Sequence, residues 1–147
     1  MLKKIIFIAL LSTASLFASG VNWAKDYHSA IKSATKENKP LLFISSRHSC
    51  KYCVMLDEQT LQDPKVIKAL NRDFIAVTSY SDENDYMPKD LWRPGTPSIW
   101  FLFPDGTPMY QPVPGYMPAV DFLNALGIVK EEFDKVDAER KAKEGKK

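Results

Sequence analysis

The sequence has 147 residues, of which 45% are hydrophobic, so it can bury one apolar core but is too short for two comfortable domains. Its 20 basic and 18 acidic residues nearly balance, and nothing in the composition therefore demands a nucleic acid or an anionic lipid surface as partner. We expect a single globular domain of unknown oligomeric state that binds no nucleic acid.

Residues 1–18 have the three regions of a secretory signal peptide. Lys3 and Lys4 supply the positive end, residues 5–11 are apolar, and residues 12–18 are mostly small. The apolar run is too short to span a bilayer, although an uncleaved anchor or a buried N-terminal helix remains the alternative. No later segment is an apolar run of transmembrane length. We therefore predict an exported, periplasmic protein that is not inserted in a membrane after the signal is removed.

One strand and two or three helical segments are predicted next along the chain. Apolar residues at helical spacing predict a helix over about 23–37, with Asn22 as its N-cap. The apolar run 41–45 has the length of a buried strand. A longer helical pattern starts at Cys50 and breaks near residue 63, where an Asp-Pro pair can cap and open a further helix.

The second half of the chain predicts three more strands and a closing helix. Strands are expected at 74–78, 98–103 and 108–113, and a Pro-Asp-Gly turn should join the last two as a hairpin. The closing helix opens at Pro118 and is expected to stop at Gly127.

Apolar residues continue at helical spacing after this glycine and then disappear. The charged segment 138–147 is predicted to be a frayed or disordered tail, which leaves residues 19–137 as the single domain. Strands that alternate with helices and end in a hairpin and a closing helix predict an α/β fold. Its centre should be a mixed sheet of about four strands with helices on both faces.

The strongest chemical signal is the motif Cys50-Lys51-Tyr52-Cys53, which follows a predicted strand and begins a predicted helix. Two cysteines three residues apart on a first helical turn can close a small disulfide. The free backbone N–H groups and the helix dipole at that end favour a thiolate. We therefore predict Cys50 as the nucleophile and Cys53 as the resolving thiol. Such motifs lower a thiol pKa from about 8.5 to roughly 3.5–7.5, a range too wide to tell an oxidant from a reductant.

Metal binding, haem attachment and structural bridging are the other uses of such a pair. The chain has only two cysteines, which excludes a four-cysteine zinc site, and Val54 stands where haem attachment needs His. A soft-metal site that adds His48 and Met55, or a purely structural disulfide, stays open as an alternative. We predict no bound metal and no cofactor.

Two charged segments are candidates for a role near the cysteine motif: a basic pair just before it and an acidic segment later in the chain. Arg47 and His48 stand just before the nucleophile, where positive charge favours a thiolate, and we predict that His48 tunes the site. Both residues could instead be solvated loop residues. Four acids gather in the segment 82–90, which either shapes partner docking or is an ordinary solvated loop.

Three stretches of the sequence resemble the thioredoxin superfamily: Ser49 to Cys53, Leu61 to Val66, and Gly95 to Ser98 before an apolar strand. The resemblance covers about residues 22–127 and is strongest with the exported branch that includes the C-terminal domain of the thiol:disulfide interchange protein DsbD. The cysteine motif and the Thr-Pro pair are specific for the fold and say little about the substrate. The resemblance thus implies a thioredoxin-like fold.

The resemblance also implies how a substrate would be held. Pro97 is expected to be a cis-proline whose loop faces the cysteines, and Thr96 is expected to offer backbone groups to an extended substrate segment. Tyr52, between the two cysteines, is predicted to present an aromatic surface to the same substrate.

The chain departs from many members of the family at two positions. Ser49 stands where they have Trp before the first cysteine, and Ile44 stands where they have a buried Asp. Without that buried Asp, the acid predicted to assist proton transfer from Cys53 is Asp57, one helical turn further on.

We therefore predict an exported thiol:disulfide oxidoreductase that reduces disulfides in proteins and is itself served by a redox partner protein. The alternatives are a disulfide oxidase or isomerase, and a module that keeps the fold only to bind a partner or handle a metal.

Overall fold

The computed structural model describes residues 20–146, so the signal peptide predicted at 1–18 lies outside the described residues. In chain order the elements are helix α1 (Tyr27–Glu37), strand β1 (Leu41–Ser46), helix α2 (Lys51–Met55), the π-helical turn η1 (Leu56–Thr60), helix α3 (Pro64–Asp73), strand β2 (Ile75–Tyr80), the 3₁₀ turn η2 (Lys89–Leu91), strand β3 (Ser98–Leu102), strand β4 (Val113–Pro114) and helix α4 (Ala119–Glu144).

The strands form one mixed sheet in the order β2-β1-β3-β4. Strand β1 runs parallel to β2 and antiparallel to β3, and β3 runs antiparallel to β4. Every residue of β1 and β3 is buried, because helices cover both faces of the sheet, and this explains why both strands are nearly continuous apolar runs. The predicted α/β class with a four-stranded mixed sheet is confirmed.

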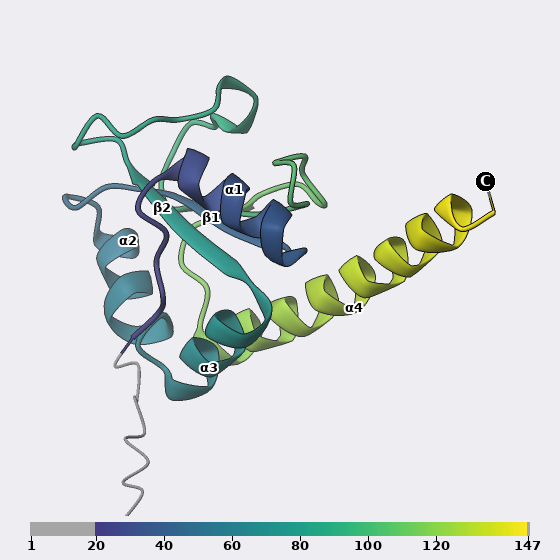
Figure 1. Cartoon of the computed structure of the whole chain (residues 1–147). Helices are drawn as coiled ribbons and strands as arrows, with labels where there is room; N and C mark the ends of the chain where they lie inside the picture. The colour runs from purple at the N-terminus through teal and green to yellow at the C-terminus, as the bar shows by residue number, and fades with distance from the viewer. Residues whose placement is uncertain (1–19, 147) are drawn as a thin grey trace, which may run out of the picture.

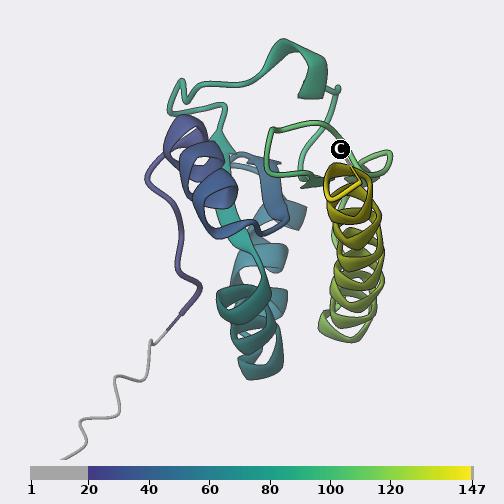
Figure 2. The ribbon, with the colours of Figure 1, turned by 45° about the vertical axis from the view of Figure 1, so that its right-hand side comes forward.

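Alternate side chains of β1 serve two different apolar clusters, one on each face of the sheet. Helix α1 packs on the face that carries Leu41 and Phe43. Helices α3 and α4 pack on the opposite face, which carries Leu42 and Ile44. Successive residues of a strand point to opposite faces, so the whole of β1 follows this alternation. Figures 1 and 2 show α1 and α4 on opposite sides of the sheet.

Helix α1 begins at Tyr27, four residues later than predicted, and its N-cap is Asp26 rather than the predicted Asn22. The backbone N–H of Asn22 instead donates to the side chain of Asn71 at 2.8 Å. Trp23 forms a parallel bridge with Ala76 of β2. The segment before α1 is therefore extended alongside the sheet, where its backbone groups are satisfied by β2 and α3.

The predicted break near residue 63 is confirmed. The Asp63 carboxylate accepts hydrogen bonds from the N–H groups of Lys65 and Val66 at 2.8 and 3.2 Å, and Pro64 is the first residue of α3. The π-helical turn Leu56–Thr60 just before this break was not predicted, because the side-chain spacing does not distinguish it from an α-helical turn.

The predicted fourth strand at 108–113 is wrong in extent. Strand β4 has only two residues, and Pro108 makes a single isolated bridge with Leu102. Prolines at 108, 112 and 114 lack the backbone N–H that a longer ladder with β3 would use.

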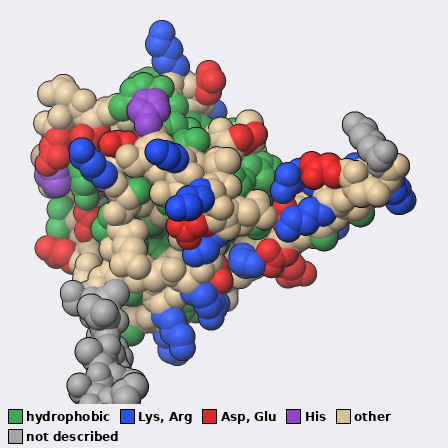
Figure 3. Space-filling view, in the orientation of Figure 1, with side chains coloured by type: hydrophobic (Ala, Val, Ile, Leu, Met, Phe, Trp, Pro, Cys, Tyr) green, Lys and Arg blue, Asp and Glu red, His purple; other side chains and the backbone are tan. Residues whose placement is uncertain are grey.

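Helix α4 was predicted to stop at Gly127 but continues to Glu144. Burial of Val129 and Phe133 beyond the glycine explains why tertiary packing overrides the local stop signal. Residues 138–144 of the segment predicted to fray are helical as well. Asp137 forms ion pairs with Arg140 and Lys141, one helical turn further on, at 2.6 and 2.7 Å. Figure 3 shows both signs of charge along this projecting end. Within residues 20–146, no helix combines the length and apolar composition needed to cross a membrane.

Candidate active site

The two cysteines occupy different environments on the same helical turn. Cys50 is the N-cap of α2, with extended backbone, and its Sγ accepts a hydrogen bond from the N–H of Cys53 at 3.2 Å. Cys50 is partly exposed, whereas Cys53 is buried, and both are free thiols. Only Cys50 can therefore be reached by a large substrate.

The electrostatic environment separates the two thiols further. Burial opposes ionisation of Cys50, but hydrogen bonds from the side chains of Cys53 and Thr96 and from backbone N–H groups outweigh it and hold the pKa of Cys50 below its ordinary value. Burial first, and then the hydrogen bond with Cys50, raise the pKa of Cys53. The thiolate is thus favoured on the exposed sulfur and disfavoured on the buried one.

A loop before β3 faces the cysteines. The Thr96–Pro97 peptide bond is cis, as the resemblance implies, and Cys50 Sγ donates to the carbonyl oxygen of Thr96 at 3.3 Å. A cavity of about 490 Å³ lies beside this loop, and Arg47, Trp92 and Thr96 are among its lining residues. Thr96 connects this cavity with the accessible sulfur, and the side chain of Tyr52, between the two cysteines, is exposed.

Strand β2 ends beside the cysteines with Tyr80, and the His48 ring stacks on the ring of this tyrosine. The two rings are stacked, with centroids 4.1 Å apart and an angle of 11° between their planes. His48 Nε2 lies 2.7 Å from Glu83 Oε1. Burial, followed by the negative charges of Asp57 and Glu83, raises the pKa of Tyr80 to about 12, and a smaller contribution comes from Cys53. Tyr80 therefore stays protonated, and it interacts with both His48 and the buried thiol.

The carboxyl group of Asp57, on η1, interacts with Tyr80 and His48. Burial raises the pKa of Asp57, while the positive charge of protonated His48 and a hydrogen bond from Tyr80 oppose the shift. A half-buried carboxylate with a raised pKa is a better proton acceptor than an exposed one.

The four acids of the segment 82–90 are exposed, and two of them also hydrogen-bond to the backbone beside the cysteines. The Asp82 carboxylate accepts a hydrogen bond from the backbone N–H of His48 at 2.8 Å. The Asp85 carboxylate accepts one from the N–H of Tyr80 at 2.9 Å. Two of the acids thus hold the loop that leads to Cys50 and the end of β2.

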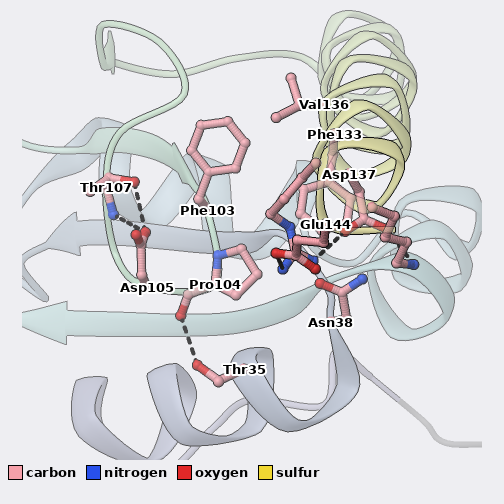
Figure 4. A pocket seen from close by; sticks show the side chains of 12 residues that line it. Thr35, Asn38, Phe103, Pro104, Asp105, Thr107, Phe133, Val136, Asp137 and Glu144 are labelled. Atoms are coloured by element: carbon pink, nitrogen blue, oxygen red, sulfur yellow. Dashed lines mark hydrogen bonds and ion pairs between the residues drawn. The ribbon is translucent and has the colours of Figure 1, made fainter. Parts of the chain in front are cut away.

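A second cavity, of about 750 Å³, lies far from this chemistry, between the end of α1, the connection from β3 to β4, and α4 (Figure 4). Phe103, Phe133 and Val136 line its apolar side, and Asp137 lines its charged side. Neither cysteine borders it, so it plays no part in the site. Among the residues that the structure describes, no three His, Cys, Asp or Glu side chains come together as a metal site.

A model of the family described as a thioredoxin-like domain matches residues 27–130 of the chain. The chain belongs to this family. Spermatogenesis-associated protein 20 from Homo sapiens is 26% identical over 123 residues, which are 74% of this chain and 14% of that protein. The chain therefore spans only a small part of the length of this curated relative.

Two solved structures resemble this thioredoxin-like protein over most of their length. A thioredoxin from Thermus thermophilus is 24% identical, with a TM-score of 0.62 and with 75% of this chain and 87% of that chain covered. The C-terminal domain of DsbD from Neisseria meningitidis, in the reduced form, is also 24% identical, with a TM-score of 0.55 and coverage of 68% and 90%. At these identities the likeness shows the fold alone.

The thioredoxin-like fold brings most of the predicted site residues together. Cys50 and Thr96 are in contact, and the bond that precedes Pro97 is cis. His48 contacts Glu83 and Tyr80, whereas the hydrogen bonds of the Cys50 sulfur are made with Cys53 and Thr96.

Sequence reasoning missed Tyr80. The predicted strand ended at residue 78, two residues before the end of β2, so Tyr80 was not assigned to the sheet. The available signal was its position in step with Ala76 and Thr78, which places its side chain on the face of the sheet that packs against the cysteine helix.

Proposed function

We propose that this thioredoxin-like protein is an exported thiol:disulfide oxidoreductase that reduces disulfides in proteins. The observation that carries the proposal is the asymmetry of the pair: Cys50 is accessible with a lowered pKa, and Cys53 is buried with a raised one. An attacking thiolate needs access and ionisation, while a resolving thiol needs only to reach its neighbour. The charged, apolar and small regions of residues 1–18 support export.

The reaction proceeds through a mixed disulfide. The Cys50 thiolate attacks one sulfur of the substrate disulfide, forms a bond with it and releases the other substrate sulfur as a thiolate. Cys53 then loses its proton to Asp57 and attacks the Cys50 sulfur, so that the Cys50–Cys53 bond forms and the bond from Cys50 to the substrate breaks. Two electrons pass to the substrate, whose two sulfurs end as thiols. A redox partner protein then returns the pair to the dithiol form.

The substrate would lie across the loop before β3. The Thr96 backbone, next to the cis bond of Pro97, can pair with an extended substrate segment, and Tyr52 and Trp92 are exposed beside it. Arg47 at the adjacent cavity adds a positive charge at this surface.

The reduction potential of the cysteine pair tests the direction of the reaction. Equilibration of the protein with glutathione buffers of known composition, followed by quantification of free thiols, gives this potential. We expect a value near that of thioredoxin, about −270 mV, and a value near that of DsbA, about −120 mV, would make the protein an oxidase instead.

Replacing His48 by Ala tests whether this residue tunes the site through Asp57. Because the positive charge of His48 lowers the pKa of Asp57, its removal should raise that pKa and shift the pH dependence of the resolving step to higher pH. The pH dependence of the Cys50 thiolate absorbance should be nearly the same in the two proteins, since the hydrogen-bond partners of this sulfur are Cys53 and Thr96. A large shift in the Cys50 titration instead would return His48 to a direct role at the nucleophile.

A further inference from the structure

Ser46, the last residue of β1, directs its side chain at the helix that carries the cysteines. The alternation along β1 puts Ser46 on the same face as Leu42 and Ile44, which pack against η1, α3 and α4. In the parallel ladder its partner is Tyr80, which lies near Cys53. Ser46 is 1% exposed, so its hydroxyl has no access to bulk water.

The Ser46 hydroxyl also lacks a partner of its own. Among the buried side-chain polar atoms of residues 20–146, only Ser46 Oγ and Trp100 Nε1 have no hydrogen bond of good geometry. A buried hydroxyl without a partner destabilises a fold and calls for an explanation. The Cys53 sulfur can supply the missing partner, because the Ser46 side chain lowers the pKa of that thiol against the effect of burial.

The Cys53 sulfur becomes a strong hydrogen-bond acceptor only when the thiol ionises. A neutral thiol is a weak hydrogen-bond acceptor, whereas a thiolate accepts strongly from a hydroxyl. In the dithiol form the Ser46 hydroxyl therefore has only a weak acceptor. It gains a strong hydrogen bond when Cys53 becomes a thiolate.

We propose that Ser46 stabilises the resolving thiolate by donating a hydrogen bond from its hydroxyl to the Cys53 sulfur. The inference rests on the proposed function and deepens it, since it assigns a donor for the second step of the exchange. The ionisable groups around Cys53 are Cys50 at the start of α2, Tyr80 on β2 and, through its hydrogen bond with Tyr80, Asp57 on η1. Of these, Asp57 takes the proton, whereas Ser46 and the backbone N–H of Arg47 stabilise the charge that is left on the sulfur.

The test is a titration of Cys53 in full-length protein that carries Cys50→Ala, so that only one thiol reacts. We expect Ser46→Ala to slow alkylation of Cys53 by iodoacetamide at pH 7 roughly three- to tenfold, the loss of thiolate that one lost hydrogen bond produces. With Cys50 restored, resolution of a mixed disulfide should slow about two- to fourfold, because a thiolate of higher pKa is also more nucleophilic. Ser45→Ala is the matched control, since Ser45 is a buried neighbour that points to the opposite face, and it should leave the Cys53 titration unchanged.

The variants Ser46→Thr and Ser46→Val provide a second comparison of equal shape in case Ser46→Ala does not fold. Only the threonine keeps a hydroxyl, so slower alkylation of Cys53 in the valine variant alone supports the inference. An unchanged Cys53 titration in Ser46→Ala, or equal titrations in the Thr and Val variants, would overturn it. The titration needs no exchange activity, so an unchanged Cys53 titration would leave the proposed function standing. A shifted Cys53 titration in a protein that reduces no disulfide would instead support the hydrogen bond and refute the proposed function.

Discussion

Replacing Cys53 by Ser is expected to turn the protein into a trap for its substrates, whereas replacing Cys50 by Ser should abolish exchange altogether. The Cys53→Ser variant keeps the accessible sulfur of Cys50 and the hydrogen bonds from the Thr96 side chain and from the backbone that lower its pKa, so the first attack can still occur. It lacks the second thiol, so the mixed disulfide persists. Turnover should fall by roughly a thousandfold or more in the Cys53→Ser variant and be absent in Cys50→Ser, because the two thiols act as a unit.

The measurement is the fraction of each variant found in mixed disulfides after incubation with a disulfide-containing protein, resolved on a non-reducing gel. Wild-type protein, which resolves its intermediates, is the control for transient species, and the double variant is the control for bridges that do not involve either cysteine. If Cys50→Ser accumulated trapped partners and Cys53→Ser did not, the nucleophile and the resolving thiol would have to be exchanged.

Local signals predicted the elements that depend on short-range chemistry. The Asp63-Pro64 pair caps and opens α3 as expected, because capping and a fixed proline φ act within one turn. The stop expected at Gly127 failed, because Val129 and Phe133 find an apolar surface and continue the helix. The first case needs no information from elsewhere in the chain, whereas the second is decided by tertiary packing.

The same division applies to the candidate site. The cysteine motif at the start of α2 could be read from four consecutive residues. The relation between Tyr80 and Asp57 could not, because the two residues belong to different elements and meet only when β2 pairs with β1 beneath the helix. The hydroxyl of Ser46 was missed for a similar reason, since its meaning depends on burial and on the face of β1 that carries it.

Replacing Asp57 by Asn should slow the resolving step and at the same time stabilise the fold at neutral pH. Burial raises the pKa of Asp57 above its value in the unfolded chain, so the folded state binds this proton more tightly. The stabilisation that follows is complete below the unfolded pKa and is lost as the pH rises through the folded pKa. At neutral pH the ionised carboxylate is therefore a cost to the fold that Asn does not carry.

The kinetic effect of Asp57→Asn has the opposite sign. In the wild-type protein the carboxylate accepts the proton of Cys53, and resolution should slow as the pH falls and Asp57 becomes protonated. Asn cannot accept that proton, so resolution should be roughly tenfold slower at neutral pH and should lose the pH step that belongs to Asp57.

Two measurements on the same protein check both parts: thermal unfolding of the reduced form at neutral pH, and the rate at which a purified mixed disulfide releases its partner between pH 4 and 8. Glu58→Gln is the matched control, because it removes the same charge from the exposed neighbouring position, where no proton transfer is expected. Equal release rates and equal pH profiles for Asp57→Asn and Glu58→Gln would show that Asp57 is a helix acid without a part in the exchange. Slower release together with a higher melting temperature in Asp57→Asn alone would identify a carboxylate that is kept for proton transfer at the expense of stability.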